Sequence, residues 1–168
     1  FTSFCQLGAF VPACCFERRV SLQVQYKGKQ ILAQAGVFGD NANDLLNDAN
    51  NSISADGRLI WMPKFGGTQL HLGGSAHIRD FNDQSPTARY RARPFAHTTD
   101  VRLIDTGNID ATGERGYGLE AAVISGPFHA AGEGFWQTMK LPGFTDPTFF
   151  GGYAEVGMAV TPGDSRSY

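Results

Sequence analysis

From Arg19 onward, apolar and polar residues alternate along most of the chain. The longest regular run covers residues 68–81, where leucine, glycine, alanine and isoleucine alternate with glutamine, histidine, serine and arginine. Successive side chains of a β-strand point to opposite faces, so this spacing predicts a strand with one apolar and one polar face. Similar patterns predict strands at 19–27, 30–38, 58–65, 68–81, 87–95, 101–104, 117–123, 128–137 and 148–161.

The segments between these strands tend to alternate between short and long. Tight turns are predicted at residues 27–29, 66–67 and 125–127, whereas 39–57 and 105–115 are long and polar. Aromatic residues such as Trp61 and Trp136 gather at strand ends, as in the belts of membrane proteins. Transmembrane β-barrels have short turns on one side of the membrane and long loops on the other. The pattern therefore favours an all-β protein, an antiparallel transmembrane β-barrel.

A soluble β-sandwich also has alternating strands. Its buried face takes large residues, whereas the apolar face here mixes leucine, valine and isoleucine with many alanines and glycines. A barrel of about 8 strands is filled by its own side chains, so long arginines on the polar side favour a wider pore. We interpret the 168 residues as a single segment of a larger barrel, with 1–16 unassigned and strands over 17–168.

Residues 87–95, TARYRARPF, place Arg89, Arg91 and Arg93 at every second position. On one strand all three share a face, with neighbours about 6.6 Å apart. Two guanidinium groups at that distance repel by roughly 2.5 kcal/mol at an effective dielectric constant of 20. An empty row is therefore costly in a narrow pore, and each arginine can donate two hydrogen bonds to an oxyanion. The row predicts an anion-binding pore lining.

Other basic residues on the polar faces are candidates for the same lining. Each of them is equally compatible with a solvated charge at a strand end. These candidates are Arg19, Lys27, Arg58, Arg79 and Arg102.

Composition narrows the possible functions. Hydrophobic residues make up 42% of the chain, but no run approaches the roughly 18 apolar residues of a transmembrane helix, which excludes a helical membrane protein. The net charge of −2 gives no overall attraction to nucleic acid. Cys5, Cys14 and Cys15 do not have the spacing of a zinc site, so no metal and no cofactor is predicted.

Two groups of polar residues raise the alternative of an enzyme. His71, Ser75 and His77 share a face, as a Ser/His hydrolase would need, but no acid lies at a supporting sequence spacing. Three glutamates on neighbouring strands of one face are compatible with paired glycosidase carboxylates or with acids that balance nearby arginines. These are Glu120, Glu133 and Glu155. We expect lumen lining in both cases and no enzyme; the alternative is a soluble or surface β-domain that binds acidic ligands.

Several segments resemble the phosphate-selective porin O and P family of Gram-negative outer membranes: ARYRARPF (88–95), DTGNI (105–109), 117–136 and 151–168. The resemblance implies a passive anion channel, a homotrimer of barrels with about 16 strands each, embedded in outer-membrane lipid. It implies phosphate or another small anion as the permeant ion. The family's ladder arginines fall on Arg89, Arg91 and Arg93. The chain would then be a central part of the barrel, without the family's first and last strands.

Overall fold

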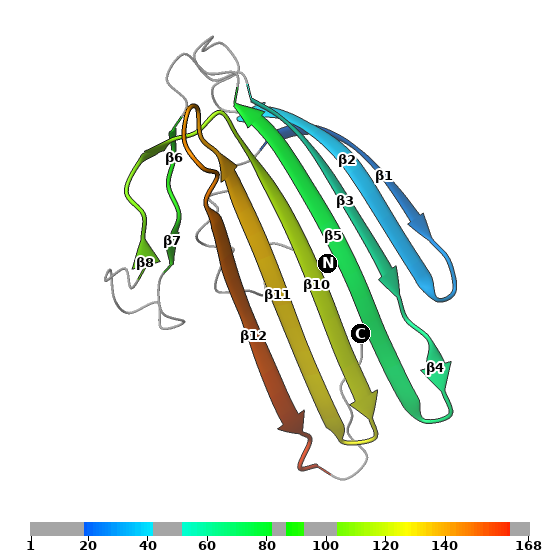
Figure 1. The fold of residues 1–168 in the computed structure, drawn as a ribbon. Helices are drawn as coiled ribbons and strands as arrows, with labels where there is room; N and C mark the ends of the chain where they lie inside the picture. The colour runs from blue at the N-terminus through cyan, green and yellow to red at the C-terminus, as the bar shows by residue number, and fades with distance from the viewer. Residues whose placement is uncertain (1–18, 42–51, 82–86, 93–103, 162–168) are drawn as a thin grey trace.

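The computed structural model describes residues 19–41, 52–81, 87–92 and 104–161. Within them, an eight-stranded antiparallel sheet runs in the order β1-β2-β3-β5-β10-β11-β12, with β4 paired to β5 (Figure 1). The all-β antiparallel prediction is confirmed, and the sheet is open, with β1 and β12 at its edges. Its strands are β1 (Arg19–Lys27), β2 (Ile31–Asn41), β3 (Ser52–Trp61), β4 (Lys64–Phe65), β5 (Thr68–Phe81), β10 (Gly113–Ser125), β11 (Phe128–Lys140) and β12 (Thr148–Met158).

The three predicted tight turns join β1 to β2, β4 to β5 and β10 to β11. Gly66 and Gly126 have φ angles of 59° and 55°, a left-handed conformation that favours glycine. In the first turn, the Gly28 amide donates to the Ile31 carbonyl at 2.8 Å. These turns fix the strand register and therefore which side chains share a face.

Several strand boundaries were predicted wrongly. β3 begins at Ser52, not at residue 58, because Ser52 and Ser54 alternate with Ile53 and continue the strand into a stretch that seemed too polar. The same strand ends at Trp61, and Pro63, which has no amide proton, separates it from β4. β2, β10 and β11 also extend further, to residues 41, 113 and 140, and β12 ends at residue 158 rather than 161. Strand ends that are rich in polar and small residues are difficult to predict from a sequence, because their apolar alternation is weak.

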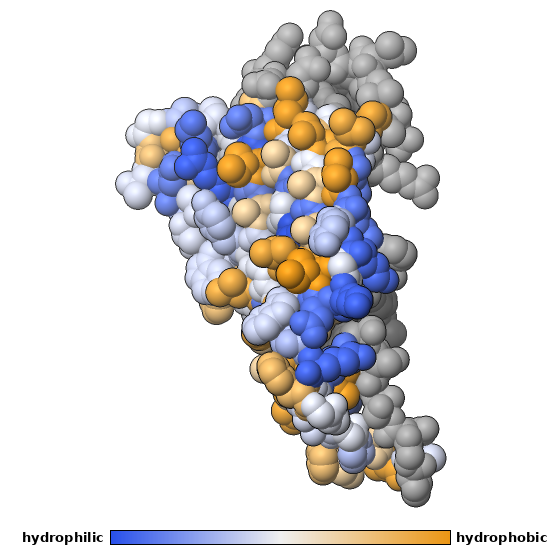
Figure 2. Space-filling model, turned by 90° about the vertical axis from the view of Figure 1, so that its right-hand side faces the viewer, coloured by the Kyte–Doolittle hydropathy of each residue, from blue (hydrophilic) through white to orange (hydrophobic). Residues whose placement is uncertain are grey.

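The two faces of the sheet differ in chemistry. One of them, the apolar face, exposes large hydrophobic side chains from edge to edge; Leu119 in the middle of β10 is 62% exposed. Figure 2 shows hydrophobic side chains exposed over most of the length of the molecule. The opposite, polar face carries the charged and hydrogen-bonding residues described below. Exposed residues of the apolar face include Leu22, Val24, Ile53, Leu59, Leu72, Ile78, Tyr117, Phe128, Phe150 and Val156.

The arginine-rich segment forms a separate small structure between β5 and β10. β6 (Thr87–Ala88) pairs with β9 (Ile109–Asp110), and β7 (Arg91–Ala92) pairs with β8 (Ile104–Asp105). We call residues 87–92 with 104–110 the arginine hairpin; β6, β7 and β8 lie beside β11 and β12 in Figure 1.

The continuous strand predicted over 87–95 is interrupted at residues 89 and 90. The interruption coincides with the burial of Tyr90, which packs against Ala111 and Met139. Of the strand predicted at 101–104, only Ile104 lies within the described residues, and β8 begins there.

No helix in the described part of the chain is long and apolar enough to cross a membrane.

Candidate functional site

Glu120, near the middle of β10, is the centre of the first polar cluster. Arg58 of β3 donates from Nη2 to both carboxylate oxygens at 2.7 Å and from Nε at 3.2 Å. His71 Nε2 lies 2.9 Å from the same carboxylate. β5 runs between β3 and β10, and Arg58 reaches across it because Gly73 has no side chain; a Cβ there would overlap the Glu120 carboxylate. The cluster joins three strands through one acid.

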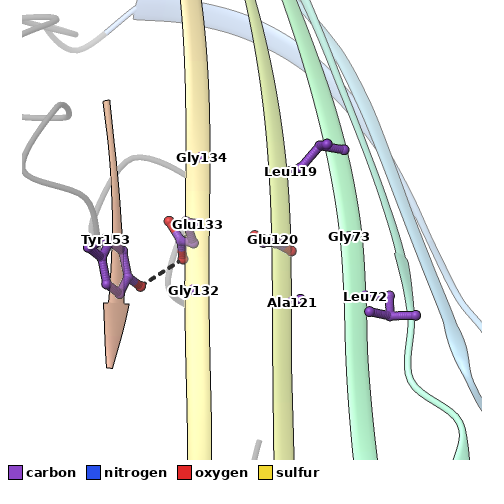
Figure 3. A pocket seen from close by; sticks show the side chains of 9 residues that line it. All are labelled: Leu72, Gly73, Leu119, Glu120, Ala121, Gly132, Glu133, Gly134 and Tyr153. Carbon is purple, nitrogen blue, oxygen red and sulfur yellow. Dashed lines mark hydrogen bonds between the residues drawn. The ribbon is translucent and has the colours of Figure 1, made fainter. Parts of the chain in front are cut away.

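Two further glutamates lie on the same face. Glu133 of β11 is directly opposite Glu120 and accepts a 3.0 Å hydrogen bond from the Tyr153 hydroxyl (Figure 3). Glu155 of β12 pairs with Ala131, two residues from Glu133, so it shares that face. The prediction that the three glutamates share a face is confirmed. Glu120, Glu133 and Tyr153 border an open hollow of about 550 Å³.

His77 is the centre of a second, buried cluster. Its Nδ1 contacts Asp56 of β3, and its Nε2 lies 3.4 Å from Glu114 of β10. Arg79 Nη1 lies 3.8 Å from Glu114, and Arg79 Nη2 donates to the Ser52 hydroxyl at 2.9 Å. Glu114 and His77 are only 5% and 8% exposed, and the buried Glu114 carboxylate has both His77 and Arg79 beside it.

These two clusters supply acids that sequence spacing did not place beside the histidines. Acids contact both His71 and His77, but they come from neighbouring strands, where sequence spacing does not reveal them. The Ser75 hydroxyl, the nucleophile of the hydrolase alternative, is buried and has no hydrogen-bond partner among the described residues. The Ser–His hydrogen bond that activates a serine nucleophile is therefore missing there.

Tyr90 attaches the arginine hairpin to the polar face. Its hydroxyl donates a 2.5 Å hydrogen bond to Glu114 Oε2, and its ring packs edge-on against Phe149 with centroids 5.4 Å apart. Glu114, Met139 and Phe149 all belong to the polar face by strand register. The hairpin therefore lies on the polar side of the sheet.

Arg89 is held by a carboxylate within the hairpin. Its Nε donates to Asp105 Oδ1 at 2.7 Å and its Nη2 to Oδ2 at 2.5 Å, a two-pronged ion pair. The hydrogen bonds to Asp105 raise the pKa of Arg89 above its ordinary value. Asp105 Oδ1 also accepts from the Gly107 amide at 3.0 Å.

Comparison with known proteins identifies the chain. The family described as phosphate-selective porin O and P matches residues 2–168. The chain belongs to this family. It is also 44% identical, over 175 residues, to an uncharacterized protein of Caulobacter vibrioides; this covers 99% of the chain but 35% of that protein. The chain thus spans about a third of the length of this relative. No solved structure matches.

Membership confirms the resemblance noted in the sequence. The porin O and P family is associated with the outer membrane, and its name denotes a channel rather than an enzyme. The open antiparallel sheet, apolar on one face and polar on the other, is the architecture expected for the wall of such a porin.

The predicted pore-lining arginines lie in different surroundings in this porin-family chain. Arg89 is exposed and bound to Asp105. Arg91 lies in β7, opposite Asp105 in register. Arg93 and Arg102 lie outside the described residues. Arg58 and Arg79 are on the polar face and contact glutamates, as expected for acids that balance arginines. The shared face of the three ladder arginines stays a prediction.

Four residues of the site were missed in the sequence: Asp56, Tyr90, Asp105 and Glu114. Asp56 follows Ser52 and Ser54 at alternate positions, and extending the strand pattern back from Arg58 would have found it. Glu114 lies in the polar first part of β10, which has no apolar alternation. No alternation of apolar and polar residues marks Tyr90 or Asp105 as site residues, because their roles depend on the docking of the hairpin.

Replacing Tyr90 by phenylalanine removes only the hydroxyl that binds Glu114. A hydrogen bond to a charged group contributes about 1.5–3 kcal/mol. We expect the Thr106 amide, which donates to the Tyr90 carbonyl at 2.9 Å, to exchange its proton roughly ten- to a hundredfold faster. Hydrogen exchange with mass spectrometry measures this rate. Tyr117→Phe, which removes a hydroxyl from the exposed apolar face, is the control; equal exchange in both variants would contradict the role of Tyr90.

Proposed function

We propose that this chain is part of the wall and constriction of an anion-selective outer-membrane porin that conducts phosphate or similar oxyanions. The observation that carries the proposal is the placement of an arginine-bearing hairpin on the polar side of a sheet whose other side is exposed and apolar. In a barrel wall the apolar face contacts lipid and the polar face lines water. The hairpin then projects into the channel.

The charge distribution supports an anion site on the hairpin rather than on the wall. Within the described strands, Arg58 and Arg79 of the polar face both contact glutamates. The neighbouring glutamates therefore neutralise the positive charge of these two arginines. Arg89 is also paired with an acid, Asp105, but Arg89, Arg91 and Arg93, which we assign to the constriction, are three arginines within five residues. Positive charge gathered on a segment inside a narrow channel attracts anions and repels cations.

Arginine suits this role for two reasons. Its guanidinium group does not lose its proton, so the channel keeps its charge at any physiological pH. The planar fork donates two parallel hydrogen bonds to an oxyanion such as phosphate. Several equivalent sites in a row let an ion pass from one to the next without a single deep trap, as conduction requires.

The open sheet and the family membership together suggest how the complete barrel is formed. An open sheet with edge strands β1 and β12 needs further strands on both sides to close a barrel. We infer a barrel of about 16 strands, closed by parts of the protein beyond this segment, and a homotrimer of such barrels.

The test is ion selectivity of the full-length protein in planar bilayers. We expect reversal potentials in a salt gradient to show anion selectivity. Arg91→Ala should weaken the preference for inorganic phosphate about ten- to a hundredfold, because it removes a charge-assisted hydrogen-bond donor. Arg115→Ala is the control, since Arg115 is exposed and lies on the apolar face by register. Cation selectivity, or equal selectivity in wild type and Arg91→Ala, would refute the proposal.

A further inference from the structure

We propose that His77 positions the arginine hairpin through Glu114 and Tyr90, and that it does so only while its imidazole ring carries a proton on both nitrogens. The hairpin is then held firmly at low pH and loosens as the pH rises. The consequence for conduction rests on the proposed function, because the hairpin carries the arginines that we assign to the constriction.

His77 lies between two carboxylates that come from different strands. Its Nδ1 contacts Asp56 Oδ1 of β3, and its Nε2 lies 3.4 Å from Glu114 Oε1 of β10. An ionised carboxylate only accepts hydrogen bonds, so each of these contacts needs an N–H on the ring. A neutral imidazole has one N–H, and the charged imidazolium has two. Both contacts are therefore hydrogen bonds only in the charged form.

The balance of charge in the cluster also favours a charged ring. Among the described residues, the titratable and charged groups around the ring are Asp56 and Arg58 on β3, Arg79 on β5, Glu114 on β10 and Tyr90 of the hairpin. Arg58 is bound to a different acid, Glu120. The two carboxylates of the cluster are thus balanced only when both Arg79 and the imidazole are positive. His77 and Glu114 are 8% and 5% exposed, and an unbalanced charge is costly in such a site.

Glu114 connects this ring to the hairpin. Its Oε1 faces His77, and its Oε2 accepts the 2.5 Å hydrogen bond from the Tyr90 hydroxyl. The contact with Asp56 is the closer of the two, so when the ring has a single proton left, that proton stays on Nδ1 and Glu114 loses its donor. Water that enters to hydrate this carboxylate then competes with the Tyr90 hydroxyl. Loss of one proton in the wall therefore loosens the hairpin.

Hydrogen exchange of the Thr106 amide reports how firmly the hairpin is docked, because this amide donates to the Tyr90 carbonyl. Protection is the intrinsic exchange rate divided by the rate measured for the full-length protein in vesicles, at about pH 5.5 and at about pH 8. We expect wild-type protection to fall about tenfold between them, as for loss of a hydrogen bond to a charged group. His77→Gln has no titrating ring and should show equal protection at both.

Asp56→Asn tests whether two carboxylates compete for one proton. Without the carboxylate of Asp56, a neutral ring keeps its single proton on Nε2, and Glu114 keeps its donor. Protection of the Thr106 amide should then be the same at the two pH values. A merely structural role of Asp56 predicts lower protection at both, with the wild-type dependence on pH. The matched control is His129→Gln, which removes another histidine from the polar face and should keep the wild-type dependence.

Three results overturn the inference. They are equal protection at the two pH values in the wild type, and the wild-type dependence on pH in either His77→Gln or Asp56→Asn. In planar bilayers the wild-type preference for chloride over potassium should also fall as the pH rises, and a constant preference overturns the role of His77 in the constriction. A channel without anion selectivity at either pH refutes the proposed function, whereas the exchange measurement does not depend on conduction.

Discussion

Replacing Glu114 by alanine should lower the free energy of unfolding by about 3–5 kcal/mol, the largest loss we expect from a single substitution in the polar clusters. Glu114 is 5% exposed and contacts three partners. They are His77 at 3.4 Å, Arg79 at 3.8 Å and the Tyr90 hydroxyl at 2.5 Å. The variant leaves these donors short of an acceptor in a site with little access to water, and such unpaired groups are costly. Urea unfolding of the refolded full-length protein in lipid vesicles measures the change.

Two variants check that the loss comes from the buried carboxylate. Glu155→Ala removes an exposed glutamate from the polar face of β12 and should change stability by less than about 1 kcal/mol. Glu114→Gln keeps an acceptor for the Tyr90 hydroxyl but not the charge, so its loss should be intermediate. Equal unfolding midpoints for wild type and Glu114→Ala would show that the cluster does not hold the hairpin to the wall.

Leu119→Arg should destabilise the folded protein in a bilayer by about 2–4 kcal/mol, if the apolar face contacts lipid as proposed. Leu119 is the middle residue of β10 and is 62% exposed on that face. An arginine near the bilayer midplane loses its hydration, and this cost decreases toward the interfaces. The fraction of folded protein in vesicles, measured by the heat-dependent shift on gel electrophoresis and by urea unfolding, reports the effect.

The matched control for Leu119→Arg places the same side chain on the polar face. Gln34 of β2 is on that face and donates to Gln25 at 3.0 Å in an exposed hydrogen bond. Gln34→Arg should cost less than about 1 kcal/mol, because its charge stays in water. A difference of less than 1 kcal/mol between the two arginine variants would refute the assignment of the two faces. A soluble domain would give that result.

Alternation alone predicted most of the sheet. Residues 68–81 were predicted with both boundaries correct, because apolar and polar positions alternate over the whole of β5. The turns at Gly66 and Gly126 were predicted because glycine favours their backbone conformation. At the start of β3, Ile53 and Ala55 alternate with Ser52, Ser54 and Asp56, but polar and small residues dominate the stretch and the boundary was missed.

The polar site was harder to predict because its contacts cross between strands. Arg58 and Glu120 are 62 positions apart in the chain, and their contact depends on the register of three strands and on the missing side chain of Gly73. The arginine spacing at 89, 91 and 93 predicted one strand, but the spacing carries no sign that Tyr90 is buried. The extended strand that the spacing favours is interrupted where the ring of Tyr90 is buried.

The position of the arginine hairpin in the chain has a consequence for engineering. The hairpin leaves the sheet after β5 and returns at β10, and these two strands are direct neighbours with an unbroken register from Gly113–Asp80 to Ser125–Thr68. The pairing of β5 with β10 therefore does not depend on the length of the segment between them. The two junctions offer sites for grafting a different recognition loop onto the same sheet.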